Sequence, residues 1–110
     1  MKSTPPYYLL MQAINSGVTS RQLMAFCYIA VNPNTSAVEL SRACKISDHS
    51  AYTTISKLKK PGSIRGLKNP LIYYSGSKPA PNNQKCEGFA VTKEGATFYK
   101  LLTGKEALNA

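Results

Sequence analysis

Apolar side chains recur at helical spacing in four successive segments of the first sixty residues. In the first, Tyr8 and Ile14 belong to an apolar side, and in the fourth, Ala51, Ile55 and Leu58 lie on one face. Helices are therefore predicted over residues 1–17, 19–32, 36–44 and 48–60.

Helix-capping residues mark where three of these helices begin. Thr19 is followed three residues later by Gln22, and Ser36 by Glu39, which is the spacing of a capping box. Ser47 is a favourable N-cap for the fourth helix, and Asp48 is placed well for the helix dipole. The third and fourth helices are thus expected to be joined by a turn of a few residues.

The second half of the chain has a different pattern. Residues 61–70 are rich in glycine and proline and indicate a loop, whereas 71–75 and 86–91 are β-branched and aromatic and predict two strands. Thr92 is expected to cap a last helix that ends at Gly104. The expected fold class is mainly α with a small β-hairpin, in the order α-α-α-α-β-β-α, as a single domain over residues 1–110.

The distribution of charge along the chain indicates the kind of partner that the protein binds. The chain has 14 lysines and arginines against 5 acidic residues, a net charge of +9. Between Asp48 and Glu87 there is no acidic residue, although seven cationic ones lie there. A solvated surface usually mixes both signs, so this clustering favours a polyanionic partner.

Several classes of function are disfavoured by the residues present. Three cysteines without a CxxC pair and the single histidine, His49, offer too few ligands for a zinc site, so we expect no metal or cofactor and reduced thiols. Nothing supplies His49 with a nucleophile or a carboxylate partner, so we do not expect an enzyme. No convincing signal peptide or bilayer-spanning run is present, and a cytoplasmic protein without membrane association is expected.

The stretch AVELSRACKISDHSAYTTISKLKK resembles the helix-turn-helix of winged-helix transcription regulators. The pair Ile46-Ser47 sits at the family's characteristic turn, and LIYYSG followed by FAVTKEG looks like the two wing strands and the threonine-x-x-glycine start of the MarR type, here Thr92 and Gly95. The resemblance covers residues 19–102, with residues 61–70 longer than the family's usual connection. It implies a winged helix-turn-helix fold.

In such a fold the second helix of the pair lies in the major groove of DNA and the wing contacts the flank. Helical spacing turns the polar side chains of 48–60 away from the core, where they can meet base edges and phosphates. The loop 61–70 and the tip of the hairpin add further polar and basic residues. The candidate DNA-contacting residues are His49, Ser50, Tyr52, Thr53, Ser56, Lys57, Lys59, Lys60, Arg65, Lys68, Lys78, Asn82, Asn83 and Lys85.

The favoured function is a sequence-specific double-stranded DNA-binding protein that regulates transcription as a homodimer, in the cytoplasm of a bacterium and associated with its nucleoid, or encoded by a phage. The N-terminal and C-terminal helices are the expected dimer contact. One alternative keeps the fold but makes the protein an architectural, excision or replication factor of a phage or mobile element. Another is a protein–protein adaptor whose basic helix meets an acidic protein, with RNA binding as a variant.

Overall fold

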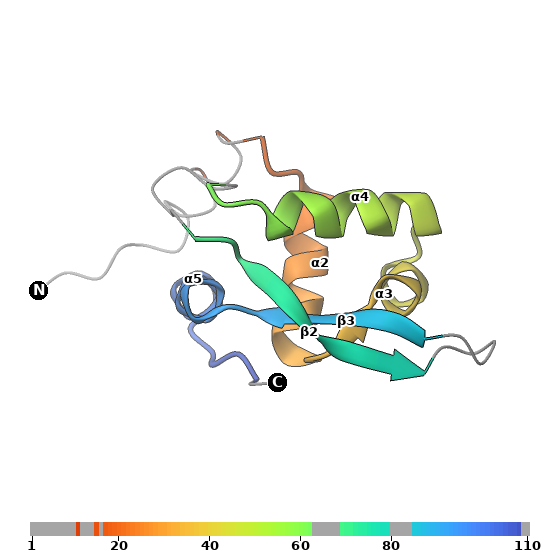
Figure 1. Cartoon of the computed structure of the whole chain (residues 1–110). Helices are drawn as coiled ribbons and strands as arrows, with labels where there is room; N and C mark the ends of the chain where they lie inside the picture. Colours follow the sequence, from red (N-terminus) through yellow and green to blue (C-terminus); the bar gives the residue numbers. More distant parts are fainter. Residues whose placement is uncertain (1–10, 12–14, 16, 63–68, 80–84, 109–110) are drawn as a thin grey trace, which may run out of the picture.

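The computed structural model describes residues 11, 15, 17–62, 69–79 and 85–108 of the chain (Figure 1). These residues form four helices and a three-stranded antiparallel sheet. The expected N-terminal helix before Gly17 therefore lies almost entirely outside the described residues. In chain order the elements are α2 (Ser20–Val31), β1 (Thr35–Ser36), α3 (Ala37–Cys44), α4 (Asp48–Lys59), β2 (Ile72–Pro79), β3 (Lys85–Val91) and α5 (Lys93–Thr103).

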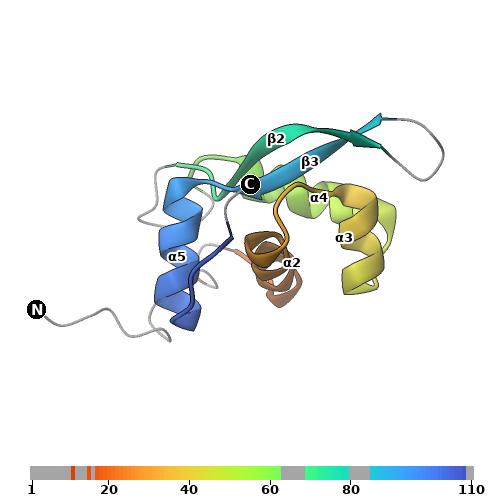
Figure 2. The ribbon, with the colours of Figure 1, turned by 90° about the horizontal axis from the view of Figure 1, so that it is seen from below.

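Helix α2 is the centre of the arrangement. Helices α3 and α5 lie on opposite sides of it in both views, and α4 crosses it (Figures 1 and 2). Phe26 of α2 is fully buried and packs against Phe98 of α5, with ring centroids 5.5 Å apart. Leu40, Leu58 and the other buried apolar residues of α3 and α4 complete one continuous core.

The predicted starts of α2, α3, α4 and α5 are confirmed. Both capping boxes form: Thr19 Oγ1 accepts from the Gln22 backbone N–H at 3.1 Å, and Ser36 Oγ accepts from that of Glu39 at 3.2 Å, while each partner's side chain accepts in return. Ser47 and Thr92 also accept first-turn backbone N–H groups. These local contacts satisfy donors that have no partner within the helix, and so they fix where each helix begins.

The expected two-stranded hairpin is present, but the sheet also contains a third strand, β1, that was not expected. The strand order is β1-β3-β2, with Thr35 paired to Phe89 and Ser36 to Gly88. The pattern of residues 35–36 did not predict β1, because two polar residues immediately before a helix show no strand periodicity. Ser36 both ends β1 and caps α3, which ties the start of α3 to the sheet.

A register shift lies between Tyr74 and Gly76 in β2. The extra residue, Ser75, donates its hydroxyl to Asn34 Oδ1 at 2.7 Å. A Cβ on Gly88 would lie 1.9 Å from the same Asn34 oxygen, so a larger residue at this position would displace the Asn34 side chain and disturb its contact with Ser75. The bulge therefore anchors the hairpin to the turn that precedes β1.

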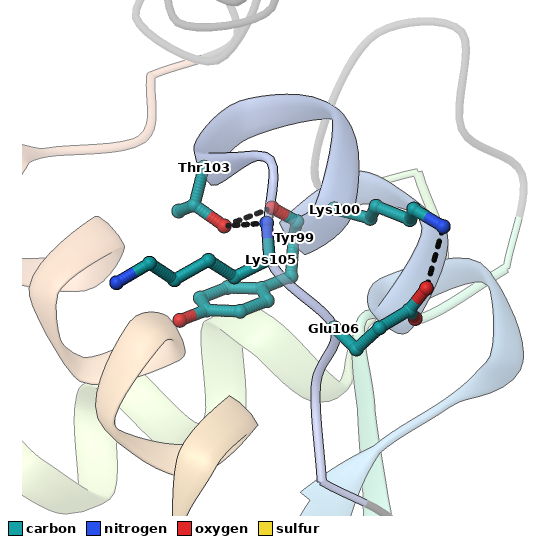
Figure 3. A network of polar contacts seen from close by, with 5 residues as sticks. All are labelled: Tyr99, Lys100, Thr103, Lys105 and Glu106. Carbon is teal, nitrogen blue, oxygen red and sulfur yellow. Dashed lines mark hydrogen bonds and ion pairs between the residues drawn. The ribbon is translucent and has the colours of Figure 1, made fainter.

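Residues after α5 fold back onto the domain (Figure 3). Gly104 ends the helix at φ 77, and Thr103 Oγ1 accepts from the Lys105 backbone N–H while donating to the Tyr99 carbonyl. Lys100 and Glu106 form an ion pair across this turn. The Leu108 N–H then donates to the Ala30 carbonyl at 2.7 Å, which satisfies one of the last carbonyls of α2.

The backbone of Leu71 joins three parts of the fold. Its N–H donates to the Leu58 carbonyl near the end of α4 at 3.1 Å, and its carbonyl accepts from the Thr92 N–H at 3.0 Å. Thr92 Oγ1 donates to the Pro70 carbonyl at 2.6 Å and caps α5 by accepting from Gly95. We call these contacts the Leu71 junction.

The Leu71 junction leaves no space for a side chain at Gly95. A Cβ there would lie 2.1 Å from the Leu71 carbonyl oxygen, which belongs to the backbone and cannot rotate away. We therefore expect Gly95→Ala to lower the free energy of unfolding by about 2 kcal/mol or more. The exposed neighbour Thr97→Ala should change it by no more than about 0.5 kcal/mol. Urea denaturation of both variants measures the difference, and equal midpoints would contradict the close contact.

Candidate nucleic-acid interface

The turn between α3 and α4 sets the orientation of α4 relative to α3. Lys45 ends α3 in the left-handed region at φ 56, and the N–H groups of Lys45 and Ile46 both donate to the Ser41 carbonyl. Ser47 then caps α4. Because the turn is only three residues long, the orientation of α4 is fixed by these few hydrogen bonds.

A side-chain contact also joins the two helices. Ser41, which is 5% exposed, donates its hydroxyl to Asp48 Oδ1 at 2.7 Å. Asp48 is the one acidic residue of α4. Its carboxylate therefore has a structural partner in α3 in addition to its favourable position at the helix start.

Helix α4 divides into a buried and an exposed side. Ala51, Ile55 and Leu58 are at most 2% exposed, as predicted, and Thr54 joins them at 3%, which the apolar pattern did not predict. On the opposite side, six candidate residues were expected to face away from the core. Four of them, His49, Tyr52, Thr53 and Ser56, are exposed, whereas Lys57 is half-buried. Ser50 is half-buried as well. Lys59 and Lys60, at the end of the helix, are exposed.

The hydroxyl groups of this exposed side already make local contacts. Thr53 Oγ1 donates to the His49 carbonyl at 2.9 Å, and Ser50 Oγ accepts from Ser47 Oγ at 3.0 Å. Tyr52 is 57% exposed. The rotamers of Ser50 and Thr53 are therefore held in place in the free protein, while the Tyr52 ring is largely in solvent.

The sheet borders the exposed side of α4 along one flank. The Lys59 ammonium lies 5.3 Å from the centroid of the Phe89 ring, and Phe89 meets Tyr74 edge-on at 6.3 Å. The sequence predicted a phosphate contact for Lys59 and gave no sign of this cation–π contact, because Phe89 is far away in the chain. The contact places the Lys59 charge at the border of α4 and β3.

The other flank borders the start of α2, where the surface is hollowed. The hollow has a volume of about 300 Å³ and is open to solvent. It is lined by Thr19, Arg21, Gln22, His49, Ser50, Thr53 and Thr54. Three of these residues were candidates from the sequence, whereas those from α2 were not, because their proximity to α4 depends on the fold.

The remaining candidates belong to the hairpin and the loop 61–70. Lys78 lies in β2 opposite Cys86, and Lys85 in β3 opposite Pro79, so both are at the end of the hairpin farthest from α5. The loop residues Arg65 and Lys68 and the tip residues Asn82 and Asn83 lie outside the described residues. Helix α4 and the long strands lie toward the same side of the molecule, which faces the viewer in Figure 1 and is uppermost in Figure 2.

Acidic residues in the described part of the chain have mostly structural contacts. Glu39 completes a capping box, Asp48 bonds Ser41, Glu94 accepts from the Asn69 amide at 2.7 Å, and Glu106 pairs with Lys100. Glu87 is exposed on β3. The exposed side of α4 therefore has Asp48 at its start as its one carboxylate, against three lysines over 57–60.

No group of three or more His, Cys, Asp or Glu in the described segments could hold a metal ion. Cys27 and Cys44 are free thiols, and burial raises the pKa of both. A raised pKa keeps a thiol protonated and poorly nucleophilic at neutral pH.

No family model, curated protein or solved structure matches this chain. Within the described segments, no helix has both the length and the apolar character needed to cross a bilayer.

The contact between Ser41 and Asp48 can be measured by a double-mutant cycle. We expect Ser41→Ala and Asp48→Ala to be coupled by about 0.5–1.5 kcal/mol of unfolding free energy, because the hydrogen bond joins two elements at a partly exposed position. Chemical denaturation of the wild type, both single variants and the double variant gives the coupling. Strictly additive effects would show that the contact does not hold α3 to α4.

Proposed function

We propose that the protein is a winged helix-turn-helix protein of the MarR-like type that binds double-stranded DNA sequence-specifically and regulates transcription. Helix α4 would enter the major groove, and the hairpin β2–β3 would act as the wing on the flanking backbone. The observation that carries the proposal is the exposed side of α4. It combines hydroxyl, imidazole and phenol groups with a basic end, on a helix whose opposite side is fully packed.

The chemistry of that side suits DNA better than a neutral partner. Hydroxyl and phenol groups donate and accept hydrogen bonds at base edges and phosphates, and Lys57 and Lys60 add positive charge. Because Asp48 is bonded to Ser41, its carboxylate is held toward α3 rather than left among these groups. The net charge of +9 favours rapid association with a polyanion.

Binding to a partly symmetric site would involve two copies of the chain. The proposed dimer contact includes α5, on which Leu101 is 38% exposed, together with the segment before α2. Sedimentation of the free protein and of its complex would establish the number of chains per duplex.

Selection of bound fragments from a random duplex pool, followed by gel shifts with a scrambled competitor, tests the proposal. The expected result is one enriched sequence whose affinity falls steeply with salt as counterions return to the phosphates. Equal affinity for every duplex would reduce the function to non-specific binding. Binding to an acidic protein with no measurable duplex affinity would support an adaptor instead.

We predict that Thr53→Ala and Tyr52→Ala each reduce discrimination between the selected and the scrambled duplex by roughly 1–3 kcal/mol, the size of a lost base contact. Competition gel shifts at one salt concentration measure it. Both residues are exposed, so the fold should be unchanged. If both variants keep full discrimination, the proposed orientation of α4 is wrong.

Lys57→Ala and Lys60→Ala should act differently. Phosphate contacts position the protein without specifying sequence, so each variant should weaken both duplexes alike and make the dependence of affinity on salt shallower. Lys105→Ala, which removes the same charge from the exposed turn after α5, is the matched control. An equal effect of all three substitutions would attribute the change to net charge alone.

A further inference from the structure

The hollow between the start of α2 and the exposed side of α4 consists entirely of polar residues. Arg21 is the one lining residue with a permanent charge, and no carboxylate lines the hollow. Sites for drug-sized ligands are usually enclosed, whereas this hollow is open to solvent and every side chain that lines it carries a polar group. Its chemistry therefore suits part of a larger charged ligand better than a small molecule.

The capping box of α2 makes this surface rich in hydrogen-bond donors. Thr19 and Gln22 accept each other's backbone N–H groups through their side-chain oxygens. These contacts use acceptor oxygens, so the hydroxyl hydrogen of Thr19 and the amide NH₂ of Gln22 stay available as donors. Ser50 likewise accepts from Ser47, so its own hydroxyl hydrogen remains to be donated. Donors beside an arginine match an anion that has several oxygens.

The position of the hollow identifies the anion. It borders the first two turns of α4, so a duplex whose major groove receives this helix would pass a sugar-phosphate backbone along its flank. Arginine is suited to phosphate because its planar guanidinium can donate two parallel hydrogen bonds. We propose that the hollow binds one backbone phosphate of the duplex, with Arg21 as its charged ligand. This inference rests on the proposed function and adds α2 to the DNA-binding surface.

The first test compares Arg21→Ala and Arg21→Lys with Lys105→Ala. Arg21→Ala should weaken the selected and the scrambled duplex alike, by roughly tenfold, and reduce the slope of log affinity against log salt by about 0.9. Arg21→Lys should restore the slope but only part of the affinity, because lysine keeps the charge without the bidentate geometry. Arg21 is exposed, so thermal unfolding should be unchanged.

The second test locates the phosphate. Duplexes in which single phosphates are replaced by neutral methylphosphonates are titrated with the wild type and with Arg21→Ala. We expect one position in each bound half-site whose neutralisation weakens the wild type but has no further effect on Arg21→Ala. If neutralising each phosphate weakens binding by Arg21→Ala as much as it weakens binding by the wild type, the inference is wrong.

These outcomes separate the inference from the proposed function. If the wild type binds no duplex, both are wrong. If it binds and Arg21→Ala behaves as Lys105→Ala does, the protein binds DNA but the hollow holds no phosphate.

Discussion

The arrangement of the domain depends on the Leu71 junction. One residue, 1% exposed, uses its N–H to bond the end of α4 and its carbonyl to bond the start of α5, at the point where the sheet begins. The chain leaves α4 at Lys60, whose backbone has the extended conformation that is favoured before a proline. At Leu71 it contacts α4 again, through the bond to the Leu58 carbonyl.

Because α4 is held at both ends, its exposed side is fixed relative to its neighbours. The three-residue turn and the bond from Ser41 to Asp48 hold its start, and the Leu71 junction and the contact of Lys59 with Phe89 hold its end. A helix held in this way presents its polar side chains in one orientation. Such preorganisation lowers the conformational cost of binding, which is what a groove-reading helix requires.

Local chemistry made much of this structure predictable from the sequence. Capping residues act within three or four positions, so the starts of α2, α3, α4 and α5 followed from the pattern, and the buried side of α4 followed from helical spacing. The features that the sequence did not predict join distant positions: β1 with β3, Thr54 with the core, Lys59 with Phe89 and Arg21 with His49. The requirement for glycine at position 95 was visible as a motif, but its cause, the Leu71 carbonyl, was not.

The most direct measurement is a titration of the ¹⁵N-labelled full chain with the selected duplex, followed by the amide chemical shifts. We expect the largest changes in α4 and in the first turn of α2, while the amide signals of the turn from Gly104 to Leu108 keep their positions. Changes confined to α5 and the segment after it, with α4 unperturbed, would contradict the claim that the polar side of α4 is the DNA-binding surface.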